Sequence, residues 1–209
     1  MTKYSLSQNW KQLDQRVRRE DEDRWLSSRY AALPERRQMI ALYALNLELA
    51  KVRLVVSEPG LAAIRFQWWR DVAAEWEAGK PARAHDVVQA IYEAGLSPKI
   101  LAGLVDGHEA ALESNDRSLE PEVLLMRAAA GLLVKVHAWG PHVQDLAPVY
   151  AAARRGEPDV AAPVVPVVPV QIRPAIAHAA LRFQYTGEKM PGPVKKRIVV
   201  MKAMMNGVV

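Results

Sequence analysis

The fold of this chain is decided by residues 36–76, which read RRQMIALYALNLELAKVRLVVSEPGLAAIRFQWWRDVAAEW. Residues 39–56 are apolar around most of a helical circumference, which is typical of a helix buried on several sides. Pro59 and Gly60 then predict a break, because proline disfavours helix at the residue before it and glycine frees the backbone to turn. A second helix is expected over residues 61–78. The two segments together predict a helical protein.

The few polar residues of the first helix are informative because the rest of its surface is apolar. Glu48 lies three residues before Lys51, a spacing that predicts an ion pair along the helix. Asn46 and Arg53 lie two turns apart on one face. They are either interior groups with hydrogen-bond partners or part of a working surface.

In the second helix, Leu61, Ile64, Trp68, Val72 and Trp76 lie on one apolar stripe, and Gly79 ends the segment. Adjacent residues of a helix point to different faces. We therefore expect one tryptophan of the pair Trp68-Trp69 to face the core and the other a neighbouring helix or a partner; core packing of both is the alternative.

Length and composition limit the class of protein. With 209 residues, half of them hydrophobic, the chain is long enough for one well-packed domain. It has no cysteine, which excludes disulfides and thiolate metal sites and fits a reducing compartment. No apolar run reaches the roughly 18 residues needed to span a bilayer, and residues 1–20 lack the apolar core of a secretion signal. We expect neither kind of segment.

The net charge of +5 is unevenly distributed. After residue 169, seven basic side chains stand against one acid, so the earlier part of the chain is close to neutral. Basic and aromatic residues do not alternate as a base-stacking surface requires. We therefore expect no nucleic-acid partner.

Further helices are expected where apolar periodicity is bounded by starting and stopping residues. The predicted ranges are 23–30 after a charged lead-in, 86–94, 97–112, 121–139 ended by Gly140-Pro141, 174–185 and 194–205. Proline recurs every third residue in the tract 161–170, which indicates polyproline II whose valines favour an apolar surface. The predicted organisation is a helical bundle over 1–160, a connector over 161–173, and C-terminal helices over 174–209 in the same domain.

Four signatures occur in order along the chain: LPERR at 33–37, ALYALNLELA at 41–50, SEP at 57–59 and RFQWWRD at 65–71. In these residues the chain resembles the squalene/phytoene synthase family, and within it the branch that contains the mitochondrial complex I assembly factor and its bacterial relatives. The resemblance is dense over residues 23–140 and looser over 170–205. It implies an all-α, terpenoid-synthase-like antiparallel helix bundle, here truncated by one or two helices.

The departures from the family concern its metal site. The resemblance implies two DxxxD segments, whose carboxylates hold the Mg²⁺ ions that bind and ionise a prenyl diphosphate. In this chain Ala50 and Leu54 stand where the first pair of aspartates would be, and the second segment has no counterpart. We therefore expect no metal, no cofactor and no catalytic residue. The face expected to line the cavity comprises Tyr43, Asn46, Leu47, Ala50 and Leu54.

The resemblance implies a non-catalytic assembly or scaffolding factor. Its expected client is a protein, a subunit of the respiratory NADH:quinone oxidoreductase. The protein itself is expected in the cytoplasm or mitochondrial matrix, peripheral to the inner membrane. Two alternatives remain open. One is an Mg²⁺-dependent prenyl-diphosphate synthase or transferase, and the other is an isoprenoid- or lipid-binding protein that keeps the cavity.

Two surfaces are predicted to make external contacts. The partner surface comprises Arg53, Arg65, Trp68, Trp69 and Arg70, because tryptophan and arginine dominate binding energy at interfaces. The basic tail residues predicted to contact an anionic membrane are Lys195, Lys196, Arg197 and Lys202. The alternative for the tail is a helix that docks on the bundle.

Overall fold

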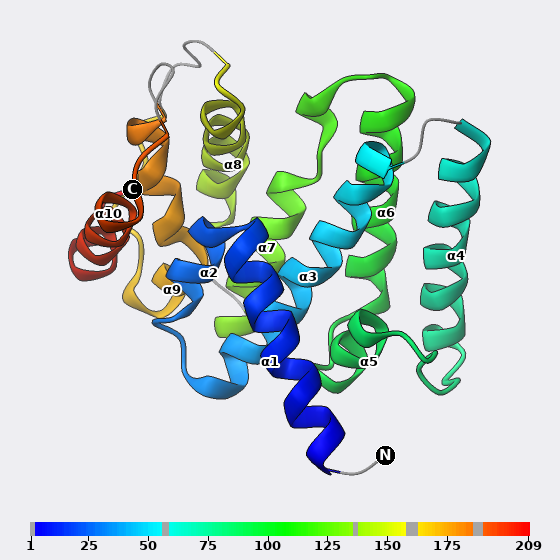
Figure 1. The fold of residues 1–209 in the computed structure, drawn as a ribbon. Helices are drawn as coiled ribbons and strands as arrows, with labels where there is room; N and C mark the ends of the chain where they lie inside the picture. The colour runs from blue at the N-terminus through cyan, green and yellow to red at the C-terminus, as the bar shows by residue number, and fades with distance from the viewer. Residues whose placement is uncertain (1–2, 56–58, 136–137, 158–162, 186–189) are drawn as a thin grey trace. The chain divides into compact units, whose positions relative to one another are not determined.

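The computed structural model describes residues 3–55, 59–135, 138–157, 163–185 and 190–209, with the backbone alone described at residues 3–8, 54, 55 and 59. All regular structure in these ranges is helical (Figure 1). The prediction of an all-α fold is confirmed.

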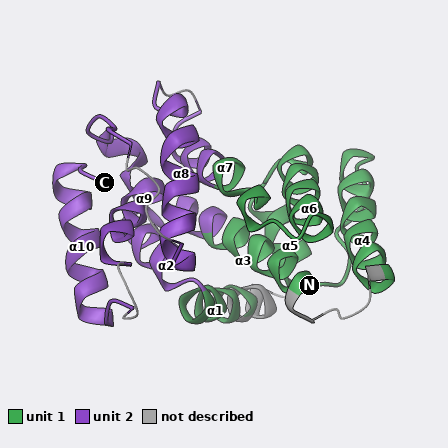
Figure 2. Ribbon diagram, turned by 90° about the horizontal axis from the view of Figure 1, so that it is seen from above, with its two compact units in different colours: residues 1–20, 40–125 green, residues 21–39, 126–209 purple. Residues whose placement is uncertain are grey.

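The chain forms two compact units, each built from two stretches of sequence (Figure 2). Unit 1 comprises Met1–Glu20 and Ile40–Leu125, and unit 2 comprises Asp21–Met39 and Met126–Val209. Helices α3 (Leu33–Val55) and α7 (Glu122–Leu133) contribute residues to both. The single domain with boundaries at residues 160 and 173 stays a prediction.

Besides its parts of α3 and α7, unit 1 contains α1 (Lys3–Glu20), α4 (Pro59–Glu77), α5 (Asp86–Glu93), α6 (Pro98–Glu113) and a 3-10 turn, η1 (Arg117–Leu119). Helix α4 packs along α6, and α1 packs against α5. Ser97 caps α6 by accepting a hydrogen bond from the backbone N–H of Lys99, and Pro98 follows at the start of the helix. Helices α5 and α6 agree with their predicted ranges to within one or two residues.

Helix α1 corrects the prediction of a charged lead-in. Leu13 and Val17 are fully buried, and the Trp10 indole N–H donates to Glu93 Oε2 at 3.1 Å. The apolar positions of α1 form a narrow stripe among charged residues, so the segment looks polar when taken alone. Burial of that stripe in unit 1 stabilises the helix.

The buried face of α4 also differs from the predicted stripe. The buried side chains are those of Ala62, Phe66, Trp69, Val72 and Ala73, whereas Leu61 and Ile64 are 51% and 66% exposed. A helix this rich in apolar residues presents more than one apolar stripe, and packing against α6 selects the one through Phe66 and Trp69.

Besides its parts of α3 and α7, unit 2 contains α2 (Glu22–Ser28), α8 (Gly140–Arg155), η2 (Val170–Ile172), α9 (Arg173–Ile176), η3 (Ala177–Gln184) and α10 (Pro193–Asn206). Helix α8 is a correction, because Gly140-Pro141 was expected to end a helix and instead begins one. The first turn tolerates proline, whose missing N–H has no helical acceptor there. The predicted helix at 174–185 is present but mostly 3-10.

Residues 163–169 of the proline-valine tract have no regular structure. Val168 is buried, and its N–H donates to the carbonyl of Gly207 at 2.8 Å. Val164, Val167 and Val170 are exposed, so the prediction that the valines lie on an apolar surface is correct for Val168 and wrong for these three.

Candidate functional site

The face of α3 that corresponds to the family's first acidic segment lies in unit 1. Tyr43 and Asn46 are buried, Leu47 and Ala50 are partly exposed, and the side chain of Leu54 lies outside the described residues. The His108 Nε2–H of α6 donates to Asn46 Oδ1 at 2.9 Å. Asn46 is therefore an interior group with a partner, and not part of an exposed working surface.

This face does not fit the magnesium site of the family's enzymes. Mg²⁺ is held in proteins through carboxylates, with water and substrate phosphates completing six oxygen ligands. The described side chains at these positions offer the Tyr43 hydroxyl and the Asn46 amide, and Ala50 offers no oxygen. Among the described residues of the whole chain, no group of three or more His, Asp or Glu side chains could hold a metal ion.

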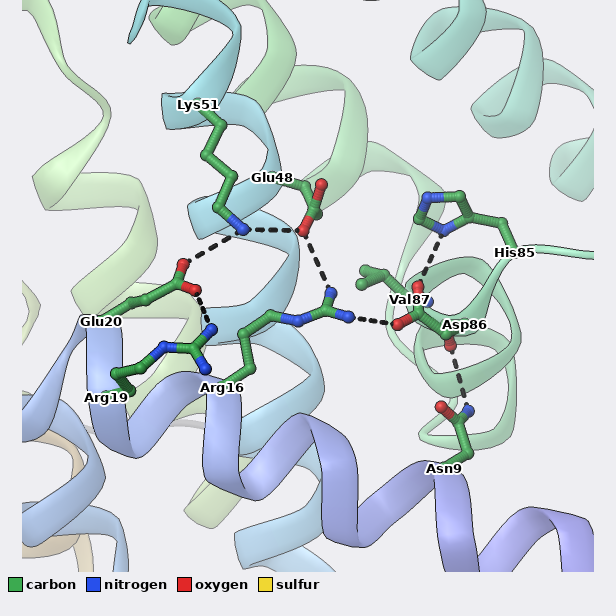
Figure 3. Close-up of polar contacts among 9 residues, drawn as sticks. All are labelled: Asn9, Arg16, Arg19, Glu20, Glu48, Lys51, His85, Asp86 and Val87. Carbon is green, nitrogen blue, oxygen red and sulfur yellow. Dashed lines mark hydrogen bonds and ion pairs between the residues drawn. The ribbon is translucent and has the colours of Figure 1, made fainter. Parts of the chain in front are cut away.

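Acids on α1, α3 and α5 are bound by basic side chains (Figure 3). Arg16 of α1 lies 3.0 Å from Glu48 Oε1 and 2.5 Å from Asp86 Oδ2, which joins α1 to α3 and α5. Lys51 lies 3.2 Å from Glu48 and 3.1 Å from Glu20, so the predicted Glu48–Lys51 pair is confirmed. Each of these carboxylates therefore already has a basic partner within unit 1.

The pKa of Glu20 shows the balance of forces in this network. Burial alone would raise it, but hydrogen bonds and charges from Arg19 and Lys51 outweigh burial and hold the pKa below its usual value. Glu20 is an ion-pair partner and not a general acid near neutral pH.

Arg53 is similarly engaged. Its guanidinium lies 2.5 Å from Glu120 Oε1, and Arg117 Nε donates to the same oxygen at 2.9 Å. Burial would raise the pKa of Glu120, yet the two guanidiniums lower it. Arg53 therefore ties α3 to the segment after η1.

The other four residues of the predicted partner surface lie on α4 and differ in exposure and in their partners. Trp69 is buried, with Trp68 edge-on to it at a centroid distance of 4.9 Å and partly exposed. Arg70 binds Asp106 at 2.9 Å and also Glu109, both on α6. Arg65 is exposed.

The outer face of α4 is apolar as well as exposed. Leu61, Ile64 and Trp68 recur at helical spacing along it, with Arg65 beside them. The Arg83 guanidinium lies 5.1 Å from the Trp68 ring, at cation–π distance. We call Leu61, Ile64, Arg65 and Trp68 the α4 outer face.

Unit 2 contains a buried charged cluster that the sequence analysis missed. Asp21 and Asp23, at the start of α2, are only 2% and 1% exposed. Asp21 lies 2.6 Å from the Arg24 guanidinium and 3.0 Å from that of Arg154. These two guanidiniums outweigh the effect of burial, so the pKa of Asp21 lies well below its usual value.

Asp23 binds three groups from distant parts of the sequence. Its Oδ2 accepts hydrogen bonds from the hydroxyls of Tyr150, at 3.0 Å, and Tyr185, and its Oδ1 lies 2.9 Å from Lys196 Nζ. Burial and the charge of Asp23 raise the pKa values of both tyrosines. The partners lie more than 120 residues away, so no local spacing could have predicted the cluster.

His178 packs edge-on against the Tyr150 ring at 4.9 Å and is buried. Neither of its ring nitrogens has a hydrogen-bond partner among the described residues. Burial, followed by the charge of Arg24, lowers the pKa of His178 well below its usual value. The cluster thus pairs each buried carboxylate with basic side chains and joins α2, α8, η3 and α10.

The basic tail residues are not equivalent. Lys195, Arg197 and Lys202 are exposed on α10, but Lys196 pairs with Asp23 and, at 3.5 Å, with Glu22. Lys196 therefore belongs to the buried charged cluster and leaves three of the four predicted membrane contacts exposed. In the part of the chain that the structure describes, no helix is long and apolar enough to cross a membrane.

Comparison with known families agrees with the sequence signatures. The family model for squalene/phytoene synthase matches residues 17–125, more than half of the chain. The looser resemblance over residues 170–205 lies outside this match and stays a prediction. Comparisons with curated proteins and with solved structures gave no match. From its signatures, its helical fold and this match, the chain belongs to the squalene/phytoene synthase family.

Proposed function

We propose that this protein is a non-catalytic family member that acts as an assembly or scaffolding factor for a protein client. The proposal is supported by the chemistry of the α3 face, where Ala50 replaces a carboxylate. It is also supported by the acids around that face, since Glu48, Asp86 and Glu120 are each bound by arginine. A metal ion at any of them would have to displace a guanidinium.

The observation that carries the proposal is the α4 outer face. Exposed apolar groups that lie together on a folded protein often mark a partner site. The Trp68 ring and the Arg65 guanidinium are side chains that supply much of the energy at protein interfaces. By the resemblance to the assembly-factor branch, the proposed client is a subunit of the respiratory NADH:quinone oxidoreductase, met in the cytoplasm or mitochondrial matrix.

The test is a pull-down from the native cell with Ile64→Glu and Arg65→Ala variants. A charge in the centre of an apolar contact is expected to lower client recovery at least tenfold, since loss of a central contact costs about 2 kcal/mol or more. Leu119→Glu, at an exposed apolar residue on η1, is the matched control. Client recovery that is equal in all four proteins would overturn the proposed surface.

A second measurement addresses the enzyme alternative. The purified protein is expected to release no diphosphate from farnesyl or geranylgeranyl diphosphate at millimolar Mg²⁺. Release above background that is lost in Glu48→Gln or Asp106→Asn would overturn the non-catalytic assignment. An isoprenoid extracted from the purified protein in stoichiometric amount would instead favour the lipid-binding alternative.

A further inference from the structure

Helix α10 carries an exposed apolar stripe that its packing in unit 2 does not use. Val194, Ile198, Met201 and Met205 recur at intervals of four, three and four residues, which places them on one face of the helix. Their side chains are between 43% and 74% exposed. The stripe runs along nearly the whole of α10.

The opposite face of α10 already anchors the helix. Val200 and Ala203 are buried, and Lys196 pairs with Asp23 of α2. The Arg173 guanidinium donates to the carbonyls of Met204 and Met205 at 2.9 Å and 2.8 Å. The exposed stripe is therefore a second apolar face, and not the surface that holds α10 to the unit.

Basic side chains flank this stripe on both sides. At 3.6 residues per turn, Lys195 and Lys202 fall together on one flank and Arg197 falls on the other. All three are exposed, and residues 190–209 contain no acid. The outward side of α10 thus combines an apolar centre with a purely positive border.

We propose that this outward side of α10 binds the surface of an anionic lipid bilayer, with the helix lying in the plane of the interface. Interfacial helices insert an apolar face between the headgroups while lysine and arginine contact the anionic groups. A second copy of the chain fits less well, because two such faces would bring six positive charges together without an acid. A protein partner is also disfavoured, since lysine is depleted at protein interfaces.

This assignment corrects the set predicted from the sequence. Lys196 is excluded because its charge is used inside unit 2, and the four apolar side chains are added. The proposal concerns unit 2 alone and does not depend on the client proposed for unit 1.

The test is co-sedimentation of the whole protein with phosphatidylcholine vesicles, with and without phosphatidylserine. The wild type is expected to bind the anionic vesicles and to dissociate at high salt. Lys195→Gln and Lys202→Gln are each expected to weaken binding about fivefold. The double variant Ile198→Ser/Met201→Ser is expected to weaken it about tenfold or more, because insertion loses apolar area.

Two controls separate lipid contact from loss of structure. Lys99→Gln removes an exposed charge from unit 1, and Leu119→Ser removes an exposed apolar side chain there. Both are expected to sediment as the wild type does, and all variants are expected to keep its melting temperature. Equal sedimentation of the wild type and the α10 variants would overturn the proposal, and so would a wild-type dimer that the α10 variants convert to monomer.

A direct probe uses the absence of cysteine from the chain. A polarity-sensitive fluorophore attached to Met201→Cys is expected to shift to the blue when anionic vesicles are added. The same fluorophore on Lys99→Cys is expected not to shift. A fluorophore at residue 201 that stays in a polar environment while the protein sediments with vesicles would place the lipid contact elsewhere and overturn the assignment to α10.

Discussion

The carboxylates that pair with Arg16 in unit 1 are partly exposed, whereas two carboxylates of unit 2 are buried. In unit 1, Arg16 pairs with Glu48 and Asp86, and about a quarter to a third of each side chain is exposed. In unit 2, Asp21 and Arg24 pair with 2% and 3% of their side chains exposed. Water and salt screen the first kind of pair but hardly reach the second.

Charge therefore contributes to the stability of this fold mainly where it is buried. Removal of one partner from a surface pair leaves the other in water at little cost. Removal of one partner from a buried cluster leaves an uncompensated charge or an unsatisfied polar group, which is strongly destabilising. We expect the largest effects at buried groups of unit 2 and the smallest at the partly exposed pairs of unit 1.

Asp23→Ala is expected to cost about 3–5 kcal/mol of unfolding free energy, as does the breaking of a buried ion pair. It removes the acceptor of the Tyr150 and Tyr185 hydroxyls and leaves Lys196 with only its longer pair to Glu22 among the described acids. Urea denaturation measures the loss. Asp145→Ala, at an exposed position on α8, is the control and should lie within about 0.5 kcal/mol of the wild type. Similar losses for the two variants would contradict the role of the cluster.

Gly207→Ala is expected to lower the free energy of unfolding by about 1–3 kcal/mol more than Gly79→Ala does. At Gly207, overpacking adds to the backbone strain that both variants share. Both glycines have a left-handed backbone, with φ values of 72° and 71°. A Cβ at Gly207 would lie 2.7 Å from the Val168 carbonyl oxygen, whereas a Cβ at Gly79 meets nothing within 4 Å. Thermal unfolding of the two variants compares them. Equal melting temperatures would show that residues 167–168 yield to the added methyl group.

Unit 2 is expected to become less stable as the pH falls below about 6.5, by about 1.4 kcal/mol per pH unit. Burial and Arg24 depress the pKa of His178 in the folded state, with Arg154 acting in the same direction and Asp21 opposing it. The unfolded chain therefore takes up a proton in this range and the folded chain does not.

His178→Gln should flatten this dependence when unfolding is measured from pH 7.5 to 5.5. His142→Gln, at a partly exposed position on α8, should not. The depressed pKa of Asp21 acts in a separate range, since its stabilisation is complete above the usual aspartate pKa and is lost only at lower pH. An unchanged slope in His178→Gln would mean that another group takes up the proton.

Arg16→Ala is expected to have the smallest effect, about 1 kcal/mol or less at low ionic strength. The loss should shrink further in molar salt, because the pairs with Glu48 and Asp86 are partly exposed. Urea denaturation at low and high salt measures both values. The Asp23→Ala loss should change little under the same conditions, and a similar salt dependence of the two would break the contrast between the units.

The α3 face shows which parts of the candidate site could be predicted from the sequence. The Glu48–Lys51 pair was evident from spacing along one helix, and the resemblance to the family implied that Ala50 stands in the place of an aspartate. The partners of Asn46 and Arg53 were not, since His108 and Glu120 lie more than 60 residues away. Which arginines of the predicted partner surface remain free to meet another protein depends on those distant acids.

By itself, the sequence determined the helical class, the positions of α3 to α6 and the family. The helical class and the helix positions follow from local causes: the spacing of apolar residues, the caps, and the prolines and glycines that end helices. The family follows from the resemblance of the four signatures, with which the family model agrees. Tertiary packing buries the acids that begin α2. It also docks α10 through Val200 and Ala203, which leaves Ile198 and Met201 exposed. An apolar or charged pattern specifies which faces a helix has, but contacts between distant residues determine which face is covered.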